Sequence, residues 1–458
     1  MELLNRLRDC LGPAHVLCGA DAAPHGRDWT GKYVSQPLAV LRPGTTAEVS
    51  AVLQIAHAEG VAVVPLGGNT GLNGGTHAEG ALMLSLARLG RIRAFDAESR
   101  SVTAEAGVVL EALQSRAAEA GLAFPLSFGA KGSAMVGGFL STNAGGSNVL
   151  RYGSARALCL GLEVVLADGR VMDLLTPLHK DNTGYDLRDL FIGAEGTLGV
   201  ITAAVLKLVP APRAHATALI GMQSLGAALS LLNTLQAGTG GALEAFEFMP
   251  AAYMARLAQR RPELSCPFPP APVNILLETA TTIAGDDPSA RLEALLGAAM
   301  AEGAVHEAVL ASSEAQRRRL WAMREAAAEI TFTTPNLIDS DVALPLDRLE
   351  VFFTRMAARL GGIDAGAEVL AIAHLGDGNI HYTVYPSRAE PGLSAEIRAA
   401  VAAEAVALGG SFSAEHGVGR SKRAEMAALK DPVALSVMAA LKAALDPKGI
   451  LNPGKLLP

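Results

Sequence analysis

Two histidines and a later Glu-His pair are the side chains whose types and spacing suit metal chemistry. His374 and His381 bracket a Gly-Asp-Gly-Asn turn, and Glu415-His416 follows further along the chain. If the turn folds back, the two imidazoles converge, and a carboxylate from a distant loop can complete a site. Two imidazoles, one carboxylate and open coordination positions suit a catalytic Zn²⁺ or Mn²⁺. Histidine pairs also occur in cores and on surfaces, so the spacing alone leaves both interpretations open.

Three glycine-rich loops are the second feature that suggests chemistry. Residues 65–75 (PLGGNTGLNGG) follow a strand predicted at 61–64, and clustered glycines let backbone N–H groups turn inward around a phosphate. The loop matches neither G-x-G-x-x-G nor a P-loop. Residues 128–154 and 193–202 are two further loops of this kind. A turn without a ligand would explain one loop, but three favour a long cofactor lying against backbone, as a flavin dinucleotide does.

The elements that must position these residues alternate strands with helices. An amphipathic helix is predicted at 1–11, and strand–helix–strand patterns begin at residue 37. Pro210-Ala-Pro212 marks a crossing between domains. Beyond it, long Ala/Leu helices such as 346–360 alternate with strands such as 368–376. The terminal run LDPKGILNPGKLLP is expected to pack back on the first domain.

Composition excludes several classes of protein. The 458 residues are half apolar, which gives room for two or three domains and a sizeable core. The net charge is −7 and no run of Lys or Arg stands out against that balance, which disfavours a nucleic-acid-binding surface. No apolar stretch is long enough to predict a transmembrane segment, and the first residues do not resemble a signal peptide. The four cysteines form no C-x-x-C pair, so we expect free thiols and a cytoplasmic location.

The order of the three loops, with Asp28-Trp29 before them and ILNPGK (450–455) at the end, resembles the FAD-linked oxidase family that includes vanillyl-alcohol oxidase and p-cresol methylhydroxylase. More narrowly, the sequence is similar to the D-2-hydroxyacid dehydrogenase branch, which contains D-lactate and D-2-hydroxyglutarate dehydrogenases. The resemblance covers essentially the whole chain and implies an α+β fold. It implies a two-subdomain FAD-binding domain of the p-cresol methylhydroxylase type at 1–210, an antiparallel-sheet substrate (cap) domain with the metal-site histidines at 211–410, and a C-terminal segment at 411–458 that returns to the flavin.

The resemblance also implies which residues bind FAD. Some relatives attach FAD through a histidine in the first loop, where this chain has Asn69 and Thr70, so noncovalent FAD is expected. The implied cofactor-binding residues are Pro65, Gly67, Gly68, Asn69, Thr70, Gly71, Leu72, Gly132, Ser133, Gly137, Gly138, Ser141, Thr142, Asn143, Gly145, Glu195, Gly196, Gly199, Ile201 and Asn452.

The catalytic set implied by the resemblance joins the metal to a base. His374, His381 and Glu415 match the residues that bind a divalent metal, Zn or Mn, in this branch. His416 then acts as the base: the metal acidifies the α-hydroxyl, the imidazole takes its proton, and hydride passes from Cα to flavin N5. Its alternative role is a fourth ligand or an orienter of a ligand. Arg324 matches an arginine that binds the substrate carboxylate, and its alternative is a surface position on a basic helix.

Three positions depart from the pattern of the 2-hydroxyglutarate enzymes. Ala328, Asp339 and Thr383 stand where those enzymes have threonine, lysine and asparagine. An aspartate in place of lysine repels a second carboxylate, by on the order of several kcal/mol at an effective dielectric of about 20. We therefore expect a monocarboxylic (R)/D-2-hydroxy acid such as D-lactate, oxidised to the 2-oxo acid, with Thr383 and His416 among the substrate-binding residues. The alternative is D-2-hydroxyglutarate, with distal contacts from Arg355 or Arg388.

The same branch suggests the partners of the protein. Reduced flavin is expected to pass electrons to a carrier such as an electron-transfer flavoprotein or a quinone, and an exposed apolar helix face would allow a homodimer.

Two other classes of protein are disfavoured. A noncatalytic flavoprotein subunit of a glycolate-oxidase-like complex has no need of the metal and base residues, and NADPH-dependent flavin reductases of this fold lack the metal histidines.

Overall fold

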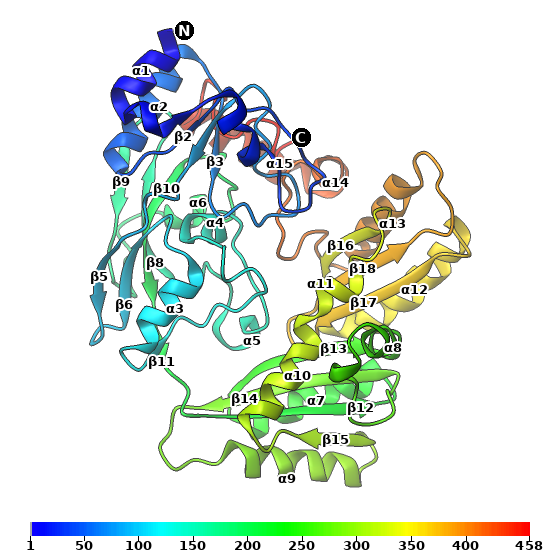
Figure 1. The fold of residues 1–458 in the computed structure, drawn as a ribbon. Coiled ribbons are helices and arrows are strands. Elements are labelled where there is room, and N and C mark those ends of the chain that lie inside the picture. Colours follow the sequence, from blue (N-terminus) through cyan, green and yellow to red (C-terminus); the bar gives the residue numbers. More distant parts are fainter. Residues whose placement is uncertain (1) are drawn as a thin grey trace. The chain divides into compact units, whose positions relative to one another are not determined.

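A computed structural model describes residues 2–458, and the chain divides into two units, coloured along the sequence in Figure 1. The first unit comprises residues 1–145, 153–210 and 415–458, and the second comprises 146–152 and 211–414. The sequence placed the boundaries after residues 210 and 410, whereas the second boundary of the structure follows Ala414. Residues 146–152, which the sequence placed in the FAD-binding domain, cluster with the second unit.

The first unit contains a four-stranded sheet built from a strand–helix–strand repeat. In sheet order its strands are β1 (Val16–Leu17), β2 (Ala39–Leu41), β4 (Leu82–Ser85) and β3 (Val63–Leu66), of which the last three are parallel. Between β2 and β3 runs α2 (Thr46–Glu59), where the Thr45 side chain accepts from the Glu48 amide and Gly60 ends the helix at φ 66°. The predicted N-terminal helix is α1 (Glu2–Leu11), which buries Leu7 and Leu11 in this core. Because β3 runs into the loop 65–75, the sheet presents that loop at a carboxyl edge, where ligands of such sheets bind.

A second, antiparallel sheet carries the other two glycine-rich loops. In sheet order its strands are β5 (Ile92–Asp96), β6 (Ser101–Glu105), β10 (Val200–Lys207), β8 (Cys159–Val165) and β9 (Val171–Leu174). The smaller elements around it are α3 (Leu110–Ala118), β7 (Leu122–Ala123), α4 (Val136–Ser141), α6 (Arg188–Phe191) and β11 (Val209–Pro210). The loop 128–154 contains α4, and the loop 193–202 leads into β10. The buried strands β8 and β10 thus anchor the loops that lie next to them in the sequence.

The second unit is built on a seven-stranded antiparallel sheet, as predicted. Its strands, in sheet order, are β15 (Glu307–Leu310), β12 (Ala214–Met222), β14 (Val273–Thr281), β13 (Leu243–Pro250), β17 (Glu368–His374), β18 (Asn379–Tyr385) and β16 (Ile338–Ala343). One face packs on α7 (Leu225–Gly238), α9 (Pro288–Ala301), α12 (Leu349–Ile363) and α13 (Leu393–Ala407). The other packs on α8 (Ala251–Arg260), α10 (Glu314–Glu325) and α11 (Ala327–Thr331). Alternation along β17 sends Ala371 and Ala373 to the first face and Leu370 and Ile372 to the second, so His374 continues the second face.

The C-terminal segment completes the first unit. After α14 (Arg423–Leu429) and α15 (Pro432–Leu445), Leu451 forms a parallel bridge with Val63 of β3. Val63 donates its amide to Ile450 O (2.7 Å) and accepts from the Asn452 amide (2.8 Å). Residues 450–452 therefore extend the sheet that carries the first glycine-rich loop.

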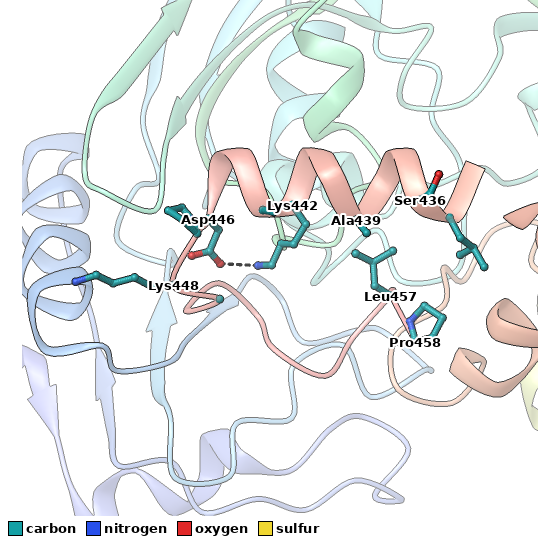
Figure 2. A pocket seen from close by; sticks show the side chains of 11 residues that line it. Ser436, Ala439, Lys442, Asp446, Lys448, Leu457 and Pro458 are labelled. Carbon is teal, nitrogen blue, oxygen red and sulfur yellow. Dashed lines mark hydrogen bonds and ion pairs between the residues drawn. The ribbon is translucent and has the colours of Figure 1, made fainter. Parts of the chain in front are cut away.

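A lysine and an aspartate hold this terminal segment in place. Figure 2 shows Lys442, in the last turn of α15, beside Asp446, which directly follows the helix; both line an open pocket of about 610 Å³ together with Leu457 and Pro458. Lys442 Nζ donates to Asp446 Oδ2 (2.5 Å), Thr197 O (2.8 Å) and Leu451 O (2.8 Å). The buried Asp446 carboxylate also accepts from the amides of Ile450 (3.0 Å) and Leu451 (2.7 Å). The pair thus joins α15, the loop 193–202 and the terminal strand.

Lys442→Met is expected to destabilise the first unit by on the order of 3 kcal/mol, because the buried Asp446 carboxylate loses its counter-charge. Lys448→Met is the matched control, since exposed Lys448 donates to the carbonyl oxygen of His57 and its loss should change stability by less than about 0.5 kcal/mol. Denaturant unfolding of the apo-protein, followed by circular dichroism, measures both variants. Equal midpoints for the two would contradict the anchoring role of Lys442.

Candidate active site

The three glycine-rich loops pack against one another through residues that belong to the first unit. A Cβ built at Gly68 would lie 1.9 Å from the carbonyl oxygen of Ser133, and one at Gly196 would lie 3.0 Å from Pro65 Cγ. The first loop therefore touches the second and the third at positions where only glycine fits. The residues implied to bind FAD are brought together by these close approaches.

Backbone strain concentrates at the implied cofactor residues. Six non-glycine residues of the described chain have positive φ, and four of them are Asn69 (55°), Asn143 (51°), Glu195 (52°) and Asn452 (41°). Such conformations are uncommon for side-chain-bearing residues and cluster at ligand sites. The asparagines also bond the loops: Asn452 Nδ2 donates to Gly75 O (3.1 Å) and Glu195 O (2.7 Å). Asn452 Oδ1 is buried without a hydrogen-bond partner among the described residues, so it fits a donor on a ligand.

Several other implied FAD residues have structural partners. The hydroxyls of Ser141 and Thr142 donate to carbonyls within α4, at 2.6 and 3.3 Å. At Gly199 a Cβ would lie 2.6 Å from Val164 Cγ1, and Ile201 is 2% exposed in β10. These two positions serve the packing of the sheet beneath the loops.

The loop that carries His416 is anchored to the glycine-rich loops. Asn73 Nδ2 donates to the carbonyl oxygens of His416 (2.9 Å) and Gly417 (2.7 Å). The Glu195 carboxylate accepts from the amides of Val418 (2.7 Å) and Gly419 (2.8 Å). Burial raises the pKa of Glu195, although these two amide hydrogen bonds oppose the shift. The sequence implied a cofactor contact for Glu195, whereas its side chain holds the backbone next to His416.

In the second unit, a β-hairpin brings the two predicted metal histidines together. His374 ends β17 and His381 lies near the start of β18, and their ring centroids are 5.3 Å apart at an interplanar angle of 78°. The turn between them is stabilised by Asp377, whose Oδ1 accepts from the Asn379 amide at 3.2 Å. A Cβ at Gly378 would lie 2.1 Å from Leu344 O, so this turn requires glycine at that position.

A buried carboxylate that the sequence analysis missed links His374 to Arg324. Glu247 of β13 is 1% exposed; its Oε1 lies 2.9 Å from His374 Nδ1, and its Oε2 accepts from Arg324 Nε at 2.9 Å. Burial favours the neutral acid, but the charges and hydrogen bonds of His374 and Arg324 lower the pKa of Glu247 to about 2. The signal in the sequence was an acidic residue inside the apolar strand LEAFEFMP.

Arg324 itself is buried and incompletely bonded. It is 8% exposed, so the surface alternative does not describe it. Its Nη2 atom is buried without a hydrogen-bond partner among residues 2–458. A buried N–H group without an acceptor is costly, which makes this nitrogen a fitting donor for a ligand carboxylate.

The three positions that depart from the 2-hydroxyglutarate pattern lie in the second unit. Asp339 of β16 is directly opposite Thr383 of β18, and Thr383 Oγ1 donates to Asp339 Oδ1 at 3.0 Å. Thr383 is two residues beyond His381 in the strand, so both side chains lie on the same face of the sheet. Ala328 belongs to α11, one of the helices that pack on this face.

Two family models match the chain. The FAD binding domain matches residues 37–175, and the C-terminal domain of FAD linked oxidases matches residues 211–456. These matches define a flavoprotein of the FAD-linked oxidase class and confirm the resemblance inferred from the three loops.

Two relatives narrow the family. A mitochondrial D-2-hydroxyglutarate dehydrogenase of Bos taurus is 42% identical over 436 residues, covering 95% of this chain and 79% of the relative. The D-2-hydroxyglutarate dehydrogenase of Xanthomonas citri pv. viticola is 36% identical, covering 95% of this chain and 93% of the relative. The chain therefore belongs to the D-2-hydroxyglutarate dehydrogenase family of FAD-linked oxidases.

The solved structure of p-cresol methylhydroxylase with substrate bound has the same fold. It aligns with a TM-score of 0.76 over 99% of this chain and 96% of its own, at 16% sequence identity. This likeness confirms the predicted fold class. Within residues 2–458, no helix combines the length and the apolar composition needed to cross a membrane.

Gly71→Ala is expected to leave the apo-protein as stable as the wild type, because no described atom lies within 4 Å of a Cβ at Gly71. If the loop lies against FAD, the added methyl group should weaken FAD binding at least tenfold, measured by titrating the apo-protein with FAD. Gly68→Ala is the comparison, because its Cβ meets Ser133 O and should lower the unfolding temperature as well. Unchanged FAD affinity in Gly71→Ala would place the cofactor elsewhere.

Proposed function

We propose that the protein is an FAD- and divalent-metal-dependent dehydrogenase that oxidises an (R)/D-2-hydroxy acid to the 2-oxo acid. The observation that carries the proposal is the buried array of His374, Glu247 and Arg324. In this array, Nδ1 of His374 is hydrogen-bonded to Glu247, and the Arg324 guanidinium bonds to the same carboxylate. The Nη2 atom of Arg324 is buried without a hydrogen-bond partner among the described residues. An α-hydroxy carboxylate suits this array, because a metal ion and a cationic side chain can recognise its oxygens together.

The donor set of the second unit fits a divalent metal. Two imidazoles that ligate one tetrahedral ion have ring centroids roughly 5 Å apart, since Zn–N bonds are about 2.0–2.1 Å long. The rings of His374 and His381 meet this condition at 5.3 Å. The proposed third ligand is Glu415. The backbone just before it is fixed near His381, because the amide of Ala414 donates to Asp341 O (3.3 Å) and Asp341 lies directly opposite His381 in the sheet.

His416 is the proposed base. Bound FAD supplies a hydride acceptor, and a bound metal ion supplies a Lewis acid that acidifies the substrate hydroxyl. His416 then takes the hydroxyl proton, since an imidazole exchanges protons near neutral pH. The hydrogen bonds from Asn73 to the carbonyls of His416 and Gly417 give this imidazole a fixed backbone. Arg324 orients the substrate by binding its carboxylate.

The proposed substrate has one carboxylate, and D-lactate is the model acid. Asp339, on the same face as His381, repels a second carboxylate by on the order of several kcal/mol. The two arginines that could bind the second carboxylate of D-2-hydroxyglutarate have other partners. Arg355 pairs with Glu404 (3.3 Å), and Arg388 pairs with Glu390 (2.7 Å). D-2-hydroxyglutarate remains the second candidate, because the relatives are named for it.

The proposed route for the electrons runs from reduced flavin to a carrier, either an electron-transfer flavoprotein or a quinone. A noncatalytic subunit is disfavoured, because the chain retains the proposed metal ligands together with His416. The hairpin that positions His374 and His381 would have no function in such a subunit.

Anaerobic mixing tests the reaction and the substrate class. The purified holoenzyme is mixed separately with D-lactate, L-lactate and D-2-hydroxyglutarate, and the absorption of oxidised flavin is followed. We expect D-lactate to bleach the flavin faster than D-2-hydroxyglutarate and the L-isomer to be inactive. Faster bleaching by D-2-hydroxyglutarate would overturn the monocarboxylic preference. Bleaching by NADPH but by none of the acids would overturn the proposed activity.

Two histidine variants separate the proposed roles. His416→Ala should keep FAD and metal but slow flavin reduction by about 10²–10⁴-fold, the usual contribution of a general base. His374→Ala should lose bound metal as well, because it removes a ligand. Metal content by elemental analysis and flavin reduction by stopped flow measure both effects. Reduction of His416→Ala at the wild-type rate would rule out its role as base.

A further inference from the structure

Glu247 occupies a position between two groups that the proposed function uses. It lies in β13, directly opposite His374 of β17, and the two carboxylate oxygens have different partners. Oε1 meets His374 Nδ1 and Oε2 meets Arg324 Nε, both at 2.9 Å. We propose that Glu247 is a positioning residue that orients His374 for metal coordination and Arg324 for the substrate carboxylate. This inference rests on the proposed function, which supplies the metal and the acid.

The first role follows from the chemistry of the imidazole. An ionised carboxylate only accepts hydrogen bonds, so the neutral ring of His374 must carry its hydrogen on Nδ1. The lone pair then lies on Nε2, and the ring plane is fixed by the bond to Glu247. Histidine ligands of metals commonly donate their other N–H to a carboxylate in this way, which fixes the tautomer and strengthens the ligand.

The second role follows from the geometry of the guanidinium. Glu247 takes the Nε–H of Arg324, and the Nη2 atom remains buried without a partner among the described residues. A guanidinium is planar, so fixing Nε fixes the direction of the remaining donors. One carboxylate therefore determines where the metal ligand and the carboxylate-binding group point.

A neighbouring glutamate provides a matched control. Glu278 of β14 lies on the same face of the sheet and is 3% exposed. It binds the same helix, α10, by accepting from Arg317 Nε (2.7 Å), Arg317 Nη2 (2.7 Å) and Trp321 Nε1 (2.8 Å). Its contacts with α10 resemble those of Glu247, but they include neither His374 nor Arg324.

The region around Glu278 is not itself a competing metal site. His215 Nδ1 lies 3.6 Å from Glu278 and 4.0 Å from Glu244, so the three residues form a second group of potential ligands. Arg151 pairs with Glu244 at 2.8 Å and Arg317 with Glu278 at 2.7 Å. These guanidinium groups already neutralise both carboxylates, which leaves little attraction for a cation.

The test compares Glu247→Gln with Glu278→Gln in the holoenzyme. A glutamine oxygen can accept from one of the two partners, and its NH₂ group faces the other donor. We expect Glu247→Gln to weaken Zn²⁺ or Mn²⁺ binding by about 10–100-fold in a chelator competition. Substitution of a residue that hydrogen-bonds to a metal ligand typically has an effect of this size. FAD content should stay unchanged, and KM for the acid should rise. Glu278→Gln should lower the unfolding temperature similarly but leave metal affinity and KM at wild-type values.

A third variant separates the two roles. Arg324→Met keeps the bond between Glu247 and His374, so it should raise KM without changing metal affinity. If Glu247→Gln does not fold, Glu247→Asp replaces it, because the shorter side chain keeps the charge but can reach only one of the two partners.

Three outcomes would overturn the inference. Equal metal affinity in wild type and Glu247→Gln would remove the role of Glu247 and leave the proposed function intact. Equal weakening in Glu278→Gln would show that a general loosening of the sheet is responsible. A wild-type protein that binds neither ion would overturn the metal-dependent function together with the inference.

Discussion

A carboxylate taken out of water has to be met by positive charge and hydrogen-bond donors, and this requirement organises the second unit. Glu247 satisfies it with His374 and Arg324, whereas Glu278 satisfies it with Arg317 and Trp321. The donors from α10 are spaced by four and then three residues, so they share one face of that helix. The helix therefore packs on the sheet through these polar donors as well as through buried Leu320 and Met323, and the Arg324 donor belongs to the candidate site.

The first unit solves a different problem, which is to bring backbone close to backbone. Gly68 and Gly137 leave no room for a side chain. A Cβ at Gly68 would lie 1.9 Å from Ser133 O, and a Cβ at Gly137 would lie 2.9 Å from Ala106 Cβ. Asn69, Asn143 and Glu195, which have positive φ, stand in the three glycine-rich loops, and Asn452 stands in the terminal segment that bonds to them. Strain of this kind persists only where the surrounding bonds enforce it. Asn452 supplies such bonds between the terminal segment and two of the loops, and Glu195 ties the loop of His416 to the loops expected to bind FAD.

The sequence was sufficient for features set by local pattern. The glycine-rich loops, and a turn that could bring His374 and His381 together by folding back, were predictable from residue types and spacing. The antiparallel sheet of the second unit was predicted from the family resemblance. Helix ends were less accurate: the helix expected at 346–360 begins as a short 3₁₀ turn at Leu346–Arg348 and continues as α12 to Ile363. Pro345 permits either start, and the choice depends on packing against the sheet.

What the sequence could not provide were pairings between distant polar residues. Nothing in LEAFEFMP says that Glu247 meets a histidine and an arginine far along the chain. Residues 146–152 cluster with the second unit, where Arg151 (2.8 Å) and Tyr152 (2.6 Å) donate to Glu244. These contacts depend on the three-dimensional placement of charged residues, which the local periodicity of the sequence does not report.

The bridge between Val63 and Leu451 has a consequence for the biosynthesis of the protein. Strand β3 is made early in translation, and it receives a hydrogen-bonding neighbour from residues 450–452, which are made much later. The whole second unit emerges from the ribosome in between. Until then the β3 edge offers unpaired N–H and C=O groups, which are a template for misassociation of nascent chains. Holdase chaperones that shield this edge during synthesis would thus favour the yield of folded protein.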